Sequence, residues 1–385
     1  MGLVKRMERK GKGALMRGIG GMLRVPRMSA EEVRATRFES VLLVRQHHQM
    51  GDMMLAIPAL RAIKETYPAA RVGVVTSTIN GAVLKNHPYL DRVFTYDKRD
   101  PLATPRLVRA IRRERFQLAI ALHTVSFSFT TLMIAVLSGA RVRVGSTSPD
   151  VGDLAGSFLN LTLPLPSPAE LETMNEAEHN LYPLRAIGIQ TDDISPLMVP
   201  APESERWAEG FAAECWTEGT VRLVVHPGAG KEENIWPPER FAQVVDGVAR
   251  LRPVSLAVVE GPRDAPAVAA FRAACGVSAR VARARPIGDI AALMQRADLV
   301  VCNDTGVMHV AVAAGARTLA VFGPTDPARW APRRDNLHVA RAADGRLASV
   351  TPERVVRKAA VLLGLVALAE DDLEREGLVG LDGDL

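Results

Sequence analysis

The sequence predicts an α/β protein with two doubly wound domains. Short apolar segments, typical of buried parallel strands, alternate with helical segments along most of the 385 residues. The alternation stops once, at residues 164–200, which are rich in proline at both ends and typical of an interdomain region. Apolar residues make up 48% of the chain, which is enough for two hydrophobic cores. We therefore predict domains at 38–190 and 191–350, preceded by a basic extension (1–37) and followed by a C-terminal helix with an acidic tail (351–385).

The first domain is expected to contain four parallel strands. They are short apolar runs at 41–45, 71–76, 93–96 and 118–122. Helices are predicted at 53–67, where Pro58 should bend or offset the helix, and at the basic segment 106–115. A further helix should follow the last strand. The uncharged stretch 116–140 is not a membrane span, because a histidine and four hydroxyl residues interrupt it.

The second domain is expected to repeat the alternation. Its strands are predicted at Val221–His226, 255–259, 299–302 and Thr318–Phe322. Its helices are predicted at 238–251, 266–275, 287–297 and 306–314, and one more helix, 172–187, lies in the interdomain region. A last helix at 352–369 can pack back across the first domain, and the acidic tail 370–385 should be mobile.

Cysteine content and charge exclude several classes of protein. The three cysteines, Cys215, Cys275 and Cys302, have no paired spacing, which excludes a disulfide scaffold or a cysteine-based zinc site and fits a reducing cytosol. We expect no metal site. Residues 1–37 contain ten Lys or Arg and three Glu, a net charge of +7, whereas the whole chain carries +5, so the remainder carries −2. An acidic body argues against a nucleic-acid partner.

The N-terminal segment 1–27 mixes basic and apolar residues. It has no long apolar core and no clean cleavage site, so it is not a typical signal peptide. A basic amphipathic segment of this kind can lie on an anionic membrane surface. A solvated tail is the alternative interpretation, and the sequence does not choose between them.

The most informative candidate site is the turn Asp304-Thr305-Gly306, which follows the predicted strand 299–302 and opens a helix. Asp304 or Thr305 can cap that helix, and Gly306 allows a ligand to approach the backbone. The free amides of the first turn, together with the helix dipole, form a site for an anion. His309, one turn later, is either a second contact to that anion or a buried structural histidine. The turn therefore predicts a bound phosphate and a nucleotide-linked ligand.

Asp52 is the candidate for proton transfer. It follows strand 41–45 and the sharp turn at Gly51, at the start of a helix. A carboxylate in this place can accept a proton from an attacking hydroxyl. The alternative is that Asp52 is only a helix cap.

The loop His226-Pro227-Gly228-Ala229-Gly230-Lys231 is a second candidate phosphate site. Two glycines and a lysine at a strand end can cradle a phosphate, although an ordinary strand–helix turn has a similar composition. The loop matches neither the Walker A pattern nor G-x-G-x-x-G, which argues against a nicotinamide-dependent oxidoreductase. Ligands of such sheets bind beyond the carboxyl ends of the strands. We therefore expect 45–54 and 302–309 to face each other across a cleft between the domains.

Three segments together resemble glycosyltransferase family 9, the bacterial heptosyltransferases of lipopolysaccharide core synthesis. They are 41–64, 226–241 and 298–332, they agree in order and spacing, and the third is the most specific. The resemblance extends over roughly residues 38–335. It implies a GT-B fold, with two Rossmann-like αβα domains facing each other across a cleft. It also implies inverting transfer of a sugar, usually heptose from ADP-heptose, to a lipopolysaccharide-core or related cell-envelope acceptor.

The resemblance also implies roles for particular residues. Asp52 becomes the general base for the acceptor hydroxyl. The donor contacts that we predict are Gly228, Lys231, Asn234, Asp304, Thr305, Gly306, Val307 and His309. No metal or cofactor is expected for the chemistry, because amides and positive groups stabilise the departing diphosphate. The partners are a nucleotide-sugar donor and a lipid-linked or glycan acceptor, at a cytoplasmic location with peripheral contact to the inner membrane face through 1–27.

Two departures from the family pattern keep alternatives open. The family often has a lysine two residues before the Trp-Pro pair, where this chain has Asn234, and Lys231 can substitute for it from nearby. The loop between Arg45 and Gly51 is one residue longer than usual. The alternatives are a nucleotide-sugar-binding protein that has lost transfer and a family member that uses a different nucleotide sugar.

Overall fold

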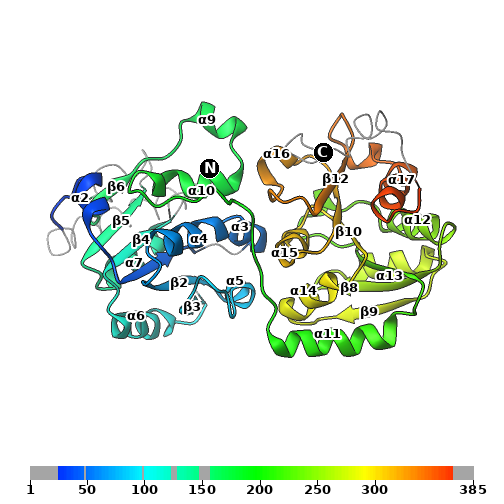
Figure 1. Cartoon of the computed structure of the whole chain (residues 1–385), viewed down its shortest axis with the longest axis horizontal. Coiled ribbons are helices and arrows are strands. Elements are labelled where there is room, and N and C mark those ends of the chain that lie inside the picture. Colours follow the sequence, from blue (N-terminus) through cyan, green and yellow to red (C-terminus); the bar gives the residue numbers. More distant parts are fainter. Residues whose placement is uncertain (1–24, 47–48, 98, 123–127, 147–156, 367–385) are drawn as a thin grey trace. The chain divides into compact units, whose positions relative to one another are not determined.

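The structure is a computed structural model that describes residues 25–46, 49–97, 99–122, 128–146 and 157–366. These residues form two compact units, which are described separately (Figure 1). The first unit draws on the ranges 25–48, 58–81 and 88–193, and the second on 49–57, 82–87 and 194–366. The predicted membrane contact through 1–27 falls almost entirely outside the described residues, and the acidic tail 370–385 does so completely.

Within the described residues, no helix combines the length and the apolar character that a membrane crossing requires.

The first unit is built on a sheet of six parallel strands in the order β3-β2-β1-β4-β5-β6. The strands are β1 (Ser40–Val44), β2 (Arg71–Ser77), β3 (Arg92–Tyr96), β4 (Leu118–Ala121), β5 (Val142–Ser146) and β6 (Leu161–Leu163). Every residue of β1 and β4 is buried, as expected for central strands covered on both faces. The four predicted strands are present, whereas β5 and β6 were not predicted.

Helices flank this sheet in sequence alternation with its strands (Figure 1). They are α2 (Ala30–Ala35), α4 (Ile57–Thr66), α5 (Thr78–Val83), α6 (Ala103–Glu114), α7 (Phe129–Leu137), α9 (Pro168–Thr173) and α10 (Glu176–Arg185). The predicted helix 53–67 is two helices in the structure. The first, α3 (Met50–Met54), ends before Pro58, and the second, α4, has Pro58 in its first turn. Proline lacks an N–H group, so it is tolerated in a first helical turn but not in a helix interior.

Part of the predicted basic extension is packed into the first unit. Ser29 caps α2 in a capping box with Glu32. The amide of Met28 donates to the Asn160 carbonyl at 2.8 Å, and the Arg34 guanidinium donates to the Ala186 carbonyl at 2.9 Å. Residues 28–35 are therefore an integral part of this unit.

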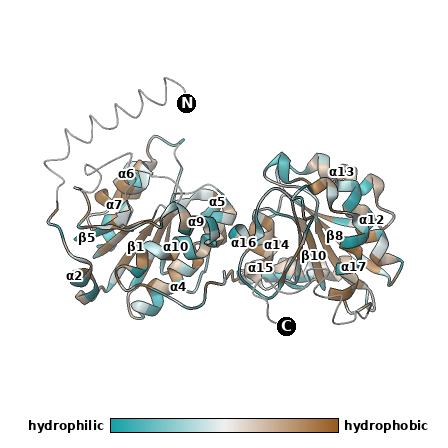
Figure 2. Cartoon of the chain, turned by 90° about the horizontal axis from the view of Figure 1, so that it is seen from above, coloured by the Kyte–Doolittle hydropathy of each residue, from teal (hydrophilic) through white to brown (hydrophobic). Residues whose placement is uncertain are grey.

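The second unit is built on another six-stranded parallel sheet, in the order β12-β11-β10-β7-β8-β9. The strands are β7 (Val221–His226), β8 (Val254–Glu260), β9 (Ala279–Arg283), β10 (Leu299–Asn303), β11 (Thr318–Phe322) and β12 (Leu337–Arg341). In Figure 2 the central strands, such as β10, are brown because their residues are apolar. The edge strands β9 and β12 were not predicted.

The helices of the second unit cover its sheet. They are α3, α11 (Pro202–Cys215), α12 (Pro238–Ala249), α13 (Ala265–Ala274), α14 (Ile287–Gln295), α15 (Gly306–Ala314), α16 (Pro327–Trp330) and α17 (Pro352–Leu362). A short 3₁₀ turn, η1 (Glu232–Asn234), precedes α12. The indole of Trp236 is fully buried, stacks edge-on against Phe241 and donates to the Val350 carbonyl at 3.1 Å.

The C-terminal helix α17 packs against α12, and Val355 and Ala359 are part of the core of the second unit. A side chain larger than hydrogen at Gly247 of α12 would clash with Val356, so glycine allows the two helices to approach closely. The structure therefore differs from the expectation that this helix packs across the first domain. Its apolar side is already buried within the second unit.

The two sheets share one topology. Numbered within each unit, both have the strand order 3-2-1-4-5-6, in which the direction of winding reverses between strands one and four. Ligands of such sheets bind at this switch point, beyond the carboxyl ends of the strands. In the second unit the switch point lies between β7 and β10, where His226 pairs with Cys302. The residues that follow these two strands are therefore in the place where a ligand is expected.

A histidine on β12 gives the second unit a testable acid sensitivity. Burial, together with the positive charges of Arg317 and Lys358, lowers the pKa of His338 to about 4. Between pH 6.5 and 4 the unfolded chain binds a proton at this residue and the folded chain does not, so the free energy of unfolding falls as the pH is lowered. Between pH 7 and pH 4 the free energy of unfolding should fall by about 2 kcal/mol more in the wild type than in His338→Gln. Urea denaturation at both pH values measures this, and parallel losses in the two proteins would contradict it.

Candidate active site

The turn between β10 and α15 has the geometry of an anion site. Thr305 is the N-cap of α15, and its Oγ1 accepts a hydrogen bond from the Val307 amide at 3.3 Å. Of the two capping residues that the sequence allowed, the structure therefore selects Thr305. The amides of Gly306 and Met308 also belong to the first turn, where amides have no partner within the helix. With the helix dipole behind them, these amides favour a negatively charged group.

The carboxylate of Asp304 is held within the protein. Its Oδ2 accepts hydrogen bonds from the Thr325 hydroxyl at 2.5 Å and from the Asn234 side-chain amide at 3.3 Å. The same amide donates to the Asp304 carbonyl at 3.2 Å, and both Asp304 and Asn234 are buried. A carboxylate would repel a phosphate, so Asp304 shapes the turn and the backbone amides supply the attraction.

Asn303, which the sequence analysis did not single out, ties the two switch-point loops together. Its side chain is fully buried at the end of β10. Its Oδ1 accepts from the Trp236 amide at 2.9 Å, and its Nδ2 donates to the carbonyls of Pro227 and Gly228 at 3.0 and 3.1 Å. The one signal in the sequence was an amide side chain directly after a buried apolar strand. Asn303 therefore fixes the loop after β7 relative to the turn after β10.

The loop after β7 also rests on a buried histidine–aspartate pair. The Nε2 atom of His226 lies 2.9 Å from Asp264 Oδ2, which also accepts from the Gly261 amide at 2.9 Å. Burial raises the pKa of Asp264, but the hydrogen bonds from His226 and Gly261 outweigh this effect, so the pKa lies below its usual value. A side chain at Gly228 would clash with Asp264, and only glycine fits there.

Two cations lie at this loop, Lys231 on the loop itself and Arg263 in the turn after β8. The predicted donor contact Lys231 is exposed, and its ammonium is 3.9 Å from the Glu233 carboxylate. Lys231 is thus outside the buried cluster that contains Asn234. Arg263, which the sequence analysis missed, donates to the Gly230 carbonyl at 3.3 Å. Both side chains are long enough to turn toward an anion bound over the glycines.

The helix α3, which carries Asp52, belongs to the second unit and packs against α15. A Cβ atom at Gly51 would lie 2.8 Å from His309 Cδ2, closer than real Cβ contacts, and one at Gly306 would lie 3.2 Å from the Cβ of Met50. Glycine at both positions therefore allows the two helices to meet at their first turns. This contact brings partly exposed Asp52 to the turn that begins α15.

The imidazole of His309 is close enough to two carboxylates to be affected by their charges. It is 5% exposed, and burial lowers the pKa of its imidazole, while the negative charges of Asp304 and Asp52 oppose this shift. The ring is therefore neutral at neutral pH. Within the described part of the chain, two buried polar atoms beside the turn have no hydrogen-bond partner, Nδ1 of His309 and Oδ1 of Asn234. Buried polar atoms are usually satisfied, so these two are suited to contacts with a ligand.

Among the residues that the structure describes, no group of three or more His, Cys, Asp or Glu side chains is placed to hold a metal ion.

Comparison with known families identifies the class of protein. The sequence profile of glycosyltransferase family 9 (heptosyltransferase) matches residues 104–359, which is two thirds of the chain. The chain belongs to glycosyltransferase family 9. This confirms the predicted family, and the protein is therefore a glycosyltransferase. The matched region of the family 9 enzyme includes all eight predicted donor contacts, whereas Asp52 lies before it.

Individual relatives agree with this assignment. The family 9 enzyme is similar to lipopolysaccharide heptosyltransferase 3 of Escherichia coli, with 22% identity over 306 residues, which is 77% of this chain and 87% of the relative. Its fold is similar to a family 9 glycosyltransferase from Veillonella parvula, with a TM-score of 0.76, 22% identity and coverage of 86% and 100% of the two chains. It is also similar to the ADP-heptose lipopolysaccharide heptosyltransferase II of E. coli, with a TM-score of 0.70, 20% identity and coverage of 84% and 98%. These likenesses confirm the predicted GT-B class, with two Rossmann-like domains.

Proposed function

We propose that this enzyme transfers heptose from ADP-heptose to a lipopolysaccharide-core or related cell-envelope acceptor, with inversion at the anomeric carbon. The observation that carries the proposal is the packing of α3 on α15, which places Asp52 beside His309 and the Asp304–Thr305 turn. A proton acceptor and an anion site thus lie together, as a single displacement on a sugar diphosphate requires. The named relatives, a lipopolysaccharide heptosyltransferase and an ADP-heptose heptosyltransferase, support the choice of sugar, nucleotide and acceptor.

In the proposed reaction Asp52 is the general base. The acceptor hydroxyl oxygen attacks the anomeric carbon of the donor sugar, and its proton passes to the Asp52 carboxylate. The bond between the anomeric carbon and the diphosphate oxygen breaks, and the nucleotide diphosphate leaves from the opposite face. Neutral His309, next to Asp52, orients the carboxylate without neutralising its charge.

The proposed diphosphate site uses fixed dipoles and nearby cations. The first-turn amides of Gly306 and Met308 in α15 face the phosphate charge that develops as the bond breaks. Lys231, on the glycine loop after β7, and Arg263, in the turn after β8, add positive charge from the other side of the switch point. We propose that these groups suffice and that neither a metal ion nor a cofactor takes part in the chemistry.

We also propose a cellular setting. Relatives named for lipopolysaccharide core synthesis suggest a lipid-linked acceptor, and such an acceptor places the enzyme in the cytoplasm at the inner membrane face. The partners are then the nucleotide sugar and the acceptor glycan, without nucleic acid. The basic segment 1–27 is proposed as a peripheral membrane contact.

The donor assignment can be tested by thermal stability with ADP, UDP, GDP and ADP-heptose. A ligand at about 100 times its Kd stabilises the folded state by about 2.7 kcal/mol, so ADP and ADP-heptose are expected to raise the Tm clearly. The variant Thr305→Glu adds a negative charge at the anion site and should abolish this rise. Thr351→Glu is the matched control, because Thr351 is the N-cap of α17 in the same unit and its side chain also accepts a backbone amide, that of Arg354. Each variant should lose about 1 kcal/mol of stability from its lost cap.

Each part of the assignment has a result that contradicts it. An unchanged ADP response in Thr305→Glu would show that the turn does not hold the phosphate. A stronger response to UDP or GDP would replace ADP-heptose with another nucleotide sugar. Donor binding without turnover, with every core acceptor, would favour the alternative of a binding protein, in which Asn234 has replaced a cation.

A further inference from the structure

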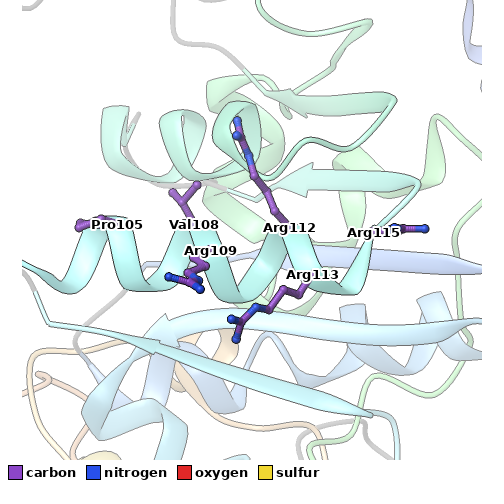
Figure 3. Close-up of a pocket in the computed structure, with 6 residues that line it drawn as sticks. All are labelled: Pro105, Val108, Arg109, Arg112, Arg113 and Arg115. Carbon is purple, nitrogen blue, oxygen red and sulfur yellow. The ribbon is translucent and has the colours of Figure 1, made fainter.

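Helix α6 of the first unit presents a row of arginines to solvent. Its buried side is formed by Leu107 and Ile111, which pack toward the sheet. On its other side Arg109, Arg112 and Arg113 are exposed, and Figure 3 shows their side chains extending from the helix. This exposed side continues to the segments that precede β1, β4 and β5, at the amino ends of the strands. The exposed side lines two adjoining hollows, and the basic residues of these hollows, which we call the arginine face, are Arg37, Arg109, Arg112, Arg113, Arg115 and Arg141.

Within the part of the chain that the structure describes, no carboxylate forms a salt bridge with the arginine face. The residues that line the two hollows include no Asp or Glu. Glu114, at the end of α6, pairs instead with Arg71 and Arg92. Among the described residues, only Arg112 of the six has a side-chain hydrogen bond, from its Nε to the Leu137 carbonyl at 2.9 Å. Like charges held this close repel one another, so the surface is suited to an anionic partner.

Guanidinium groups match phosphate groups in geometry and charge. Figure 3 shows Arg109 and Arg113 on one side of α6 and Arg112 on the other, so the charges spread over a broad area and do not converge on one small ligand. The apolar residue Leu102, 55% exposed, stands at the start of the helix, and Val108 lies among the arginines. A basic helix with apolar residues on its outer side is suited to the headgroup region of an anionic bilayer.

A nucleic acid is a poorer match. Single strands are usually bound by exposed aromatic rings, and the two rings in this region, Phe38 and Phe116, are 5% and 3% exposed. The chain beyond residue 37 has a net charge of −2, which opposes a second polyanion contact elsewhere on the body.

We propose that the arginine face docks the enzyme on the phosphate groups of an anionic lipid bilayer. Because α6 connects the carboxyl end of β3 with the amino end of β4, a flat-lying α6 places the strands of this sheet along the bilayer surface. The carboxyl ends of the strands are then at the level of the headgroups. This last consequence, unlike the docking itself, rests on the proposed function, because a lipid-linked acceptor would be presented there.

The test is co-sedimentation of the full-length protein with phosphatidylcholine vesicles, with and without phosphatidylglycerol. We expect binding only to the anionic vesicles, and less of it at high salt. The triple variant Arg109→Gln, Arg113→Gln, Arg141→Gln should bind about 100-fold more weakly, because each arginine contributes about fivefold to the partition coefficient. The matched control is Arg206→Gln, Arg250→Gln, Arg272→Gln, which removes three exposed arginines of the second unit that form no salt bridge within 4.0 Å among the described residues.

Three results would overturn the proposal. One is wild-type binding that the first triple variant leaves unchanged, since binding would then belong to another part of the chain. Another is an equal loss in both triple variants, which would reduce the effect to net charge. The third is binding of duplex DNA, and not of anionic vesicles, through the same arginines. Neither donor nor acceptor is present in the assay, so its result is independent of the proposed transfer reaction. Circular dichroism melts of both variants identify any loss of folding.

Discussion

Asp52→Asn is expected to lower the turnover number for sugar transfer by about 10²–10⁴-fold. Asparagine has nearly the same size as aspartate but cannot take the proton from the acceptor hydroxyl. Asp52 is partly exposed in the first turn of α3, so the substitution buries no new polar group. Donor affinity should stay close to that of the wild type, because the diphosphate is assigned to the first turn of α15. Steady-state kinetics measures the turnover number, and calorimetry measures the donor Kd.

Asp246→Asn provides the matched control for Asp52. Asp246 is a partly exposed carboxylate of the same unit, and it accepts a hydrogen bond from the Gly276 amide at 3.0 Å, before β9. Its substitution should leave the turnover number unchanged. If Asp52→Asn retained wild-type turnover, the assignment of the base would be wrong. If it lost donor binding together with turnover, Asp52 would be a binding residue.

Asn303→Ala should destabilise the second unit by about 3–5 kcal/mol and also weaken donor binding. The substitution leaves three buried backbone groups without a partner, the Trp236 amide and the carbonyls of Pro227 and Gly228, at about 1–3 kcal/mol each before local relaxation. It also removes the link between the loop after β7 and the turn after β10. These two segments form the proposed phosphate site, and they would then no longer be held in a fixed relative position. Urea denaturation measures the stability, and calorimetry with ADP measures the affinity.

Asn336→Ala separates the two effects. Asn336 also uses its side-chain amide to hold two backbone carbonyls, those of Val312 and Ala316, at 3.1 and 2.8 Å. It precedes β12, at the amino ends of the strands, whereas Asn303 is at the carboxyl end of β10. We expect it to lower stability and leave the ADP affinity intact. Equal affinities in Asn303→Ala and the wild type would refute the linking role of Asn303.

The parts of the fold that could be predicted are those in which local sequence and burial agree. The strands Val221–His226 and Thr318–Phe322 are continuous apolar runs at the centre of a sheet, and their predicted bounds are those of the structure. The edge strand β9 (Ala279–Arg283) mixes apolar residues with two arginines, and only Ala282 is buried, so its pattern does not separate it from a loop. Helix α11 lies in a proline-rich region and begins with Pro202, and it is stabilised by packing on α14, a contact that local pattern does not reveal.

Some residues of the candidate site could likewise be predicted from local sequence, and others could not. Asp304, Thr305 and Gly306 could be predicted because a strand, a cap and a helix start are all local signals. Asn303 was missed because its partners Trp236 and Pro227 are 67 and 76 residues away in sequence. No local pattern indicates which amide such a side chain will meet.

The sequence predicted that 45–54 and 302–309 face each other across a cleft between the domains, but not that α3 packs directly on α15 within the second unit. This packing depends on Gly51 fitting against His309, far along the chain. Lys231 was predicted from its type and position, but the structure places its ammonium in solvent beside Glu233. Its role at the diphosphate remains a prediction.

The most direct measurement for the central claim is analysis of the products that the wild-type enzyme forms from ADP-heptose and a heptose-containing lipopolysaccharide core acceptor. Mass spectrometry should show one added heptose per acceptor, with one ADP released for each transfer, and NMR should show an inverted anomeric configuration. The reaction should proceed in the presence of a chelator, since the proposed site uses amides, lysine and arginine. Release of ADP without sugar on the acceptor, or retention of the anomeric configuration, would contradict a single displacement with Asp52 as the base.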